Sequence, residues 1–296
     1  MHRILIEPLK PGLANIKDLL LVPDEVLLPL PFAVLLTDKD GDVFLHLAEA
    51  YRSHQQLLPQ QMIHHNYASL SWLAKSYTLT ILPSSSALRL LRQQRRLASG
   101  ATEAFIGFGD PVLQGTGSTR GGTMMAGHGA QIDLERLRSL NRLPGTRLEL
   151  ITIAHALGVD PSDHLYLDQQ ATETQVRRLN ASGQLGKARV LAFSTHGLLA
   201  GDLQGLAQPG LVLTLPTVPS DDDDGILSLE DVLQLKLTHT DWVILSACNT
   251  AAGDGSGEAL SGLARAFFFA GAKALLVSYW SVDDAATQAL MTETFT

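Results

Sequence analysis

From residue 104 onward, short apolar runs alternate along the chain with segments of helical periodicity. The apolar runs predict strands at 104–108, 164–167, 189–194, 242–247 and 274–279. The periodic segments predict helices at 146–157, 172–179, 256–270 and from 283 onward, with a short helix after Ser228. Alternation of this kind predicts a mostly parallel sheet that helices cover on both faces. In such sheets, sites gather beyond the carboxyl ends of the strands.

The first 100 residues follow a different pattern, so we expect a β-rich N-terminal part over 1–100 and an α/β core over 101–296. Apolar runs predict strands at 19–22, 26–36, 43–47 and 77–82. Pro23 and Asp24 suit a turn between the first two runs. The serines at 84–86 are expected to cap a helix that ends near Ala98.

Local signals predict several helix boundaries and two loops. Thr172 is an expected N-cap, and Ser228 with Asp231 fits a capping box. The glycine-rich segment 114–130 is expected to be a mobile loop. The segment 216–225 carries four consecutive aspartates. We expect this segment to be exposed, because a cluster of carboxylates is costly to bury.

Composition excludes several classes of partner. The 296 residues include 22 basic and 30 acidic side chains, a net charge of −8, and the only basic cluster is at 89–96. Nucleic-acid binding is therefore not expected. The longest apolar stretch, 264–280, is interrupted by Arg265 and Lys273 and is short for a membrane span. With no signal peptide evident at the N-terminus, a soluble cytoplasmic protein without a membrane partner is expected.

The single cysteine of the chain, Cys248, ends the apolar run 242–247, and His196 ends the run 189–194. One cysteine excludes an intrachain disulfide, which fits a reducing compartment. The two residues are 52 positions apart, the spacing typical of a caspase-type cysteine nucleophile and its histidine. Both follow strands of the expected parallel sheet, so the fold and the chemistry point to one place.

These two residues permit nucleophilic catalysis. A thiol attacks as the thiolate, and a neighbouring imidazole is its usual activator. His196 would accept the proton from Cys248 and return it to a leaving amine. The backbone N–H groups of Gly197 and Cys248 are candidates for stabilising the oxyanion. No side-chain acid follows in an obvious position, so the sequence predicts a dyad.

Other motifs support weaker hypotheses. The glycines of 253–257 follow a strand, but Glu258 stands where a dinucleotide-binding motif would need glycine, so a flexible loop is expected. Asp283 and Asp284 either favour a helix N-terminus or line a pocket for a basic side chain. The ten histidines form no metal motif. The aspartate run could hold calcium loosely, but it lacks EF-hand spacing. We therefore expect neither a metal nor a cofactor.

Taken together, the motifs resemble those of the CHAT domain, a caspase-like family often found with TPR repeats. The likeness begins with the sequences Ser194-Thr195-His196-Gly197 and Ser246-Ala247-Cys248-Asn249-Thr250. It extends over nearly the whole chain, through the segments 20–24, 30–35, 77–86, 107–111, 143–146, 224–231, 257–267 and 280–284.

The resemblance implies a caspase-like three-layer α/β/α sandwich and a cysteine endopeptidase that acts on a protein or peptide substrate. His196 matches the base of the family and Cys248 its nucleophile. Asp283 or Asp284 matches an acid that shapes the first specificity pocket in some relatives, which implies cleavage after Arg or Lys. The chain stops inside what resembles the penultimate helix. No TPR repeat precedes the domain, so regulation by a domain of that kind would lie outside this chain or be absent.

Two rival hypotheses remain open. A catalytically inactive module could keep the caspase-like fold and serve as an interaction surface or scaffold in a signalling or defence system. A nucleotide-binding switch could use the glycines of 253–257. Reactivity of the thiol that depends on His196 would favour the peptidase over the first rival, and failure of ATP or NAD to raise the melting temperature would count against the second.

Overall fold

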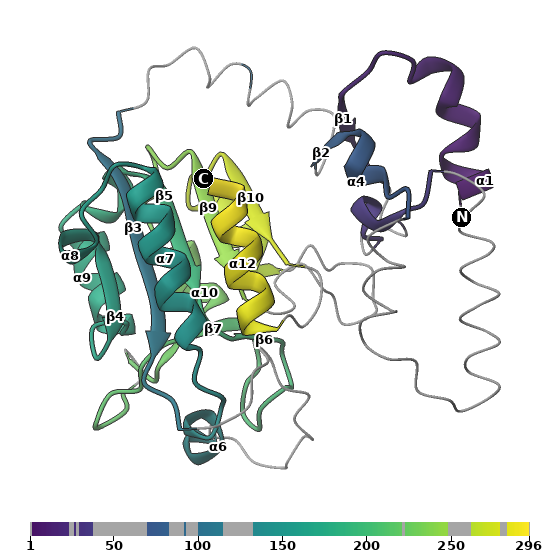
Figure 1. The fold of residues 1–296 in the computed structure, drawn as a ribbon. Helices are drawn as coiled ribbons and strands as arrows, with labels where there is room; N and C mark the ends of the chain where they lie inside the picture. Colours follow the sequence, from purple (N-terminus) through teal and green to yellow (C-terminus); the bar gives the residue numbers. More distant parts are fainter. Residues whose placement is uncertain are drawn as a thin grey trace. The chain divides into compact units, whose positions relative to one another are not determined.

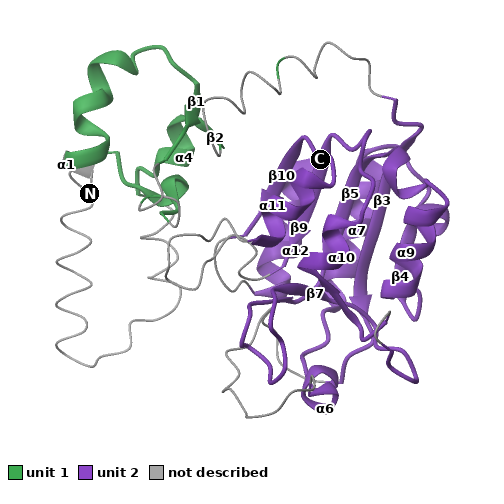
Figure 2. Ribbon diagram, turned by 180° about the vertical axis from the view of Figure 1, so that it is seen from behind, with its two compact units in different colours: residues 1–92 green, residues 93–296 purple. Residues whose placement is uncertain are grey.

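The computed structural model describes residues 2–23, 27, 30–37, 70–82, 92, 100–114, 133–220, 223–247, 262–278 and 283–295. These residues belong to two compact units, 1–92 and 93–296 (Figure 2). Within the described residues, no helix has both the length and the apolar character needed to cross a membrane.

The N-terminal unit contains two short strands that pair in parallel, although they are far apart in sequence. Strand β1 (Asp18–Leu21) pairs with β2 (Thr78–Ile81), with Asp18 opposite Thr78. The other elements of the unit are α1 (His2–Leu5), η1 (Glu7–Gly12), η3 (Phe32–Val34) and α4 (Leu73–Ser76). Ile6, Phe32, Leu35 and Leu73 form its buried core.

The strand expected at 26–36 is wrong for the part of it that the structure describes. Phe32–Val34 form a single turn of 3-10 helix, with Pro31 as its N-cap. Pro29 and Pro31 have no N–H to donate to a strand ladder, which disfavours a strand here. The apolar character of the run instead reflects burial of Phe32 and Leu35. The run at 43–47 and the helix expected at 84–98, apart from Arg92, lie outside the described residues.

The C-terminal unit is built on a five-stranded parallel sheet, as the alternating pattern predicts. The strands are β3 (Glu103–Pro111), β4 (Leu165–Asp168), β5 (Ala188–Ser194), β9 (Trp242–Ser246) and β10 (Ala274–Val277). They lie in the order β10-β9-β5-β3-β4. The chain order reverses between β3 and β5, and such a switch point is where open α/β sheets bind ligands.

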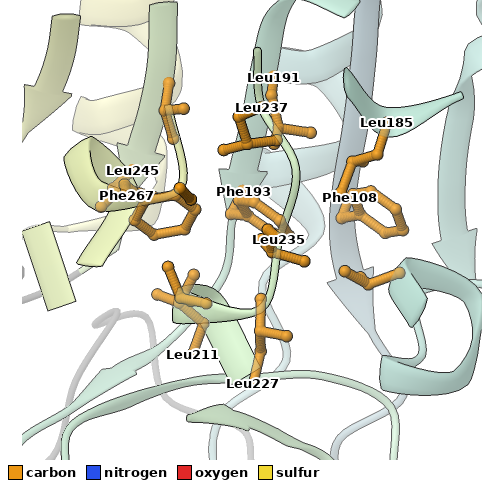
Figure 3. Close-up of a cluster of buried hydrophobic side chains, with 14 of the residues drawn as sticks. Phe108, Leu185, Leu191, Phe193, Leu211, Leu227, Leu235, Leu237, Leu245 and Phe267 are labelled. Carbon is orange, nitrogen blue, oxygen red and sulfur yellow. The ribbon is translucent and has the colours of Figure 1, made fainter. Parts of the chain in front are cut away.

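Helices cover both faces of this sheet, which makes a three-layer α/β/α sandwich (Figure 1). Helices α7 (Pro144–Ala156) and α12 (Asp284–Phe295) pack on one face through Leu150, Ile153 and Met291. Helices α9 (Glu173–Ala181), α10 (Leu229–Leu233) and α11 (Gly262–Phe269) pack on the other. There Phe193 stacks against Phe108 and touches Phe267, at the centre of the larger apolar cluster (Figure 3).

A small antiparallel sheet follows β5 directly. It consists of β6 (Gly197–Leu198), β7 (Gly210–Val212) and β8 (Ile226–Ser228). Figure 1 shows it at the carboxyl end of the parallel strands. The remaining elements are α6 (Leu134–Arg138), α8 (Pro161–His164) and η4 (Leu185–Lys187). The expected caps are confirmed, because Thr172 caps α9 and Ser228 forms a capping box with Asp231 at α10.

The aspartate-rich loop is less exposed than its composition suggests. Asp223 is only 9% exposed, and its carboxylate accepts hydrogen bonds from the N–H and hydroxyl of Thr174. Asp224 is half-buried, and its N–H donates to Glu173. The expectation of an exposed run is therefore wrong here. The carboxylate of Asp223 is buried against the first turn of α9, where unpaired N–H groups and the helix dipole compensate its charge. Asp221 and Asp222 lie outside the described residues.

Glu173 joins this loop to two helices and carries an unusual pKa. Its Oε1 accepts hydrogen bonds from Arg177 at 2.9 and 2.7 Å, and Arg177 also binds Asp231 at 2.7 Å. Burial raises the pKa of Glu173 from its ordinary 4.5 to about 7, against the opposing effect of Arg177. Desolvation therefore outweighs the ion pair at this junction.

We predict that Glu173→Gln removes a pH-dependent loss of stability. Because the folded pKa is raised, the proton's contribution to stability is complete below about pH 4.5 and is lost as the pH rises through about 7. Urea unfolding at several pH values should show that the free energy of unfolding of the variant rises relative to that of the native protein between pH 5 and pH 8. This relative increase should be on the order of 3 kcal/mol at most. The exposed Glu135→Gln is the control, and a gain independent of pH would contradict the prediction.

Candidate active site

The candidate catalytic residues follow two neighbouring strands. Strands β5 and β9 pair in parallel with Ser194 opposite Ser246, and the N–H of Thr195 donates to Ser246 O at 3.3 Å. His196 comes two residues after Ser194, and Cys248 comes two residues after Ser246. Cys248 itself lies outside the described residues. Adjacent strands are about 4.8 Å apart, so this register brings the two segments that lead to His196 and Cys248 to one edge of the sheet.

Hydrogen bonds from two sides fix the chain at this edge. The hydroxyl of Thr195 donates to Val212 O, and the N–H of Val212 donates to His196 O at 2.9 Å. The hydroxyl of Ser278, just after β10, donates to Ala247 O. The backbone on which both candidate residues depend is therefore held by β7 on one side and by the end of β10 on the other.

The imidazole of His196 is fully buried and has a defined orientation. Its Nε2 lies 2.8 Å from the backbone carbonyl oxygen of Asn141, in the segment that precedes α7. A carbonyl oxygen can only accept, so Nε2 carries the proton in this contact. In the neutral ring the lone pair then resides on Nδ1. Nδ1 is therefore the basic atom of this histidine.

The sequence gives no signal for the contact with Asn141. Every residue has a backbone carbonyl, so its role depends only on where the chain passes. The expected dyad is thus supplemented by a main-chain acceptor, which orients the ring as a carboxylate does in other catalytic sites. A backbone acceptor brings no charge with it.

The amide of Gly197, an expected oxyanion donor, points away from β7. In an antiparallel ladder, hydrogen-bonded and non-hydrogen-bonded pairs alternate. Val212 bonds to His196, so the next pair, Gly197 with Leu211, is of the non-bonded kind. The N–H of Gly197 is therefore not used by this ladder. This direction is compatible with the expected role, and the second expected donor, the amide of Cys248, lies outside the described residues.

The structure gives Asp283 and Asp284 contacts at helix ends. Asp284 is 6% exposed, and its Oδ2 accepts the N–H of Gly145, in the first turn of α7, at 2.7 Å. Asp283 is exposed, and its Oδ1 accepts the N–H of Ala286 at 3.0 Å as the N-cap of α12. These contacts account for both carboxylates without a substrate. Binding of a basic side chain by either one stays a prediction.

An ion-pair cluster at the ends of β3 and β4 was not anticipated from the sequence. The guanidinium of Arg147 donates to the carboxylates of Asp110 and Asp168, and Arg142 Nη2 lies 3.7 and 3.8 Å from the same two carboxylates. Burial raises the pKa of Asp110. The position of both aspartates at carboxyl ends of parallel strands is the signal that could have identified them.

An open pocket of about 460 Å³ lies beside this cluster. Its wall combines Arg147 and Asp168 with the apolar side chains of Ile151, Leu165 and Leu167. Among the residues that the structure describes, no three metal-ligating side chains come together. The glycines of 253–257 lie outside the described residues.

The fold and the comparisons identify the family. A parallel sheet of five strands with helices on both faces, and a histidine at the end of its central strand, is the architecture of a caspase-like α/β/α sandwich. The family model of the CHAT domain matches residues 1–296, the whole chain. The chain therefore belongs to the CHAT domain family, which is related to the caspase-like peptidases. A search of curated proteins found no match.

We predict that Asp284→Ala lowers stability more than Asp283→Ala does. Loss of the Asp284 carboxylate leaves the N–H of Gly145 without this acceptor at a part-buried site, which should cost about 1–3 kcal/mol. Loss of the exposed cap at Asp283 should cost about 1 kcal/mol or less. Urea unfolding of the two variants measures both costs. An Asp284→Ala variant as stable as the native protein would show that the contact with Gly145 does not support the fold.

Proposed function

We propose that this chain is a cysteine endopeptidase of the caspase-like type, with His196 as base and Cys248 as nucleophile. The observation that carries the proposal is the register of β5 with β9, which pairs Ser194 with Ser246 two residues before each candidate. The orientation of the imidazole by Asn141 supports it, because it leaves Nδ1 as the basic atom. Membership of a family related to caspase-like peptidases supports it further.

The proposed reaction proceeds in two steps. In the first, Nδ1 of His196 takes the thiol proton, the sulfur of Cys248 bonds to the scissile carbonyl carbon, and the amides of Gly197 and Cys248 stabilise the oxyanion. The C–N bond then breaks, and His196 returns its proton to the leaving amine. In the second step His196 takes a proton from water and the hydroxide attacks the thioester carbon. The C–S bond then breaks, the acid product leaves, and His196 returns its proton to the sulfur of Cys248.

Cleavage after a basic residue is the finer part of this proposal. It depends on a carboxylate that can face a substrate, and of the two candidates Asp283 is the exposed one. Asp284 is buried against the start of α7. In this proposal Asp283 therefore attracts Arg or Lys, while Asp284 holds the helix that leads to the site.

We predict that the thiol of Cys248 reacts as an activated nucleophile. Because the chain has a single cysteine, iodoacetamide labels one site, and its rate can be followed by mass spectrometry. The rate near pH 7 should exceed that of a free cysteine at least about tenfold, because the histidine increases the thiolate fraction. His196→Gln, which keeps a side chain of similar size, should reduce the rate to that of an ordinary thiol.

Turnover should depend on the same two residues. A random peptide library incubated with the native protein should yield cleavage products, and Cys248→Ala and His196→Gln should each yield none while keeping the native circular dichroism spectrum. A Cys248→Ala variant that cleaves as well as the native protein would disprove the mechanism. An alkylation rate that does not depend on His196 would favour the alternative, a catalytically inactive interaction module.

A further inference from the structure

A buried carboxylate that the proposed mechanism does not use lies in α7. The residues of α7 that are buried are Thr146, Glu149, Leu150, Ile153 and Ala154. This is the spacing of a helix face that packs on a sheet. Glu149 is 0% exposed within this face. Burial of a carboxylate costs several kcal/mol unless it is compensated, so packing alone gives no reason for a glutamate at this position.

Glu149 contacts the strand that leads to the candidate base. The hydroxyl of Ser194 donates to Glu149 Oε1 at 2.8 Å, and both groups are buried. Ser194 is the last residue of β5, two positions before His196. Thr195 forms a bend between Ser194 and His196, and two steps along the chain span at most about 7.6 Å between Cα atoms. The residue that binds the carboxylate is therefore separated from His196 by Thr195 alone.

The same segment of chain makes the contact that orients the ring. Asn141, whose carbonyl accepts from His196 Nε2, lies eight positions before Glu149. Asn141, before α7, thus holds the imidazole that follows β5, and Glu149, in α7, holds the hydroxyl of Ser194 at the end of β5. The first contact carries no charge, and the second brings a carboxylate.

We propose that Glu149 is a positioning residue for His196. Through Ser194 it fixes the end of β5, and its negative charge favours the imidazolium that forms when His196 takes the thiol proton. The inference rests on the proposed function, because it assigns to Glu149 a part in the same site. The carbonyl of Asn141 is a neutral acceptor, and the expected dyad contains no carboxylate. Glu149 supplies the negative charge that both lack.

Other charged groups near this edge are accounted for by their own contacts. On α7, Arg147 binds Asp110 of β3 and Asp168 of β4, and Arg142 lies beside the same pair. On α12, Asp284 binds Gly145. Arg189 lies at the amino end of β5, and Asp241, which pairs with Lys273, immediately precedes β9. Because these groups keep their own contacts, a change in the titration of His196 on removing the charge at position 149 can be attributed to Glu149.

The test is the titration of His196 by NMR in the Cys248→Ala background, where no thiolate contributes. The signal is assigned with His196→Gln. Adding Glu149→Gln keeps the size of the side chain and an acceptor for Ser194, and removes the charge. The midpoint of His196 should then fall by about 0.5–1 pH unit. Asp241→Asn, at the opposite end of the strands, is the matched control and should leave the midpoint unchanged.

With Cys248 present, Glu149→Gln should lower the alkylation rate at pH 7 about three- to tenfold. This factor is the shift of about 0.5–1 pH unit in the midpoint of His196, expressed as a lower fraction of thiolate. Should this variant fail to fold, Glu149→Met replaces the charge by an apolar group of similar size, an exchange that buried sites tolerate, and should show the same lower midpoint.

An unchanged midpoint of His196 in a folded Glu149→Gln or Glu149→Met variant would overturn the proposal and reduce Glu149 to a structural residue. The titration needs no turnover. The positioning role can therefore fail while peptidase activity is observed, and a shifted midpoint supports it even where no peptide is cleaved.

Discussion

The parallel hydrogen bonding of β5 with β9 is the constraint on which the rest of the candidate site depends. Its register sets Ser194 opposite Ser246, and side chains on neighbouring parallel strands point to the same face at the same level. A slip of one residue would send the side chains of one strand to the opposite face. The two faces of β5 carry side chains of different size, with Leu191 and Phe193 on one and Val190 and Ala192 on the other. Close packing of these side chains opposes such a slip.

The start of α7 supports this edge of the sheet from one side. The hydroxyl of Thr146 accepts the N–H of Asp110, near the end of β3, and Arg147 binds the Asp110 carboxylate. Glu149 binds Ser194 of β5. In turn, Asp284 of α12 accepts the N–H of Gly145. Catalytic groups need to be held by packed side chains and hydrogen bonds to keep a productive geometry. On this side of the sheet the holding groups come from α7 and the segment before it, and Asp284 of α12 supports the start of that helix.

Much of this architecture could be predicted from sequence, because it depends on local patterns. The buried strands ending at Ser194 and Ser246 are continuous apolar runs, and the cap at Thr172 and the capping box at Ser228 use side chains with a known local geometry. The family resemblance also followed from motifs, and the match over the whole chain confirms it.

What sequence could not give depends on contacts between distant segments. The carbonyl of Asn141 carries no side-chain signal, and Glu149 occupies a helical position that appears ordinary until the sheet lies beneath it. The composition of its loop predicts that Asp223 is exposed, but Asp223 is buried because a helix N-terminus lies beside it.

The turn at Phe32 differs, because the signal against a strand there is local. The segment has the apolar character of a strand, but its prolines have no N–H to donate to a strand ladder.

The central claim, that the sulfur of Cys248 meets Nδ1 of His196, is tested most directly by cross-linking. The short bifunctional reagent 1,3-dibromoacetone alkylates a cysteine and then a nitrogen within reach of its three carbons. We expect one intramolecular product, with Cys248 joined to Nδ1 of His196 in the peptide map. A product in which Cys248 is alkylated without a link, or is joined to another histidine, would contradict it.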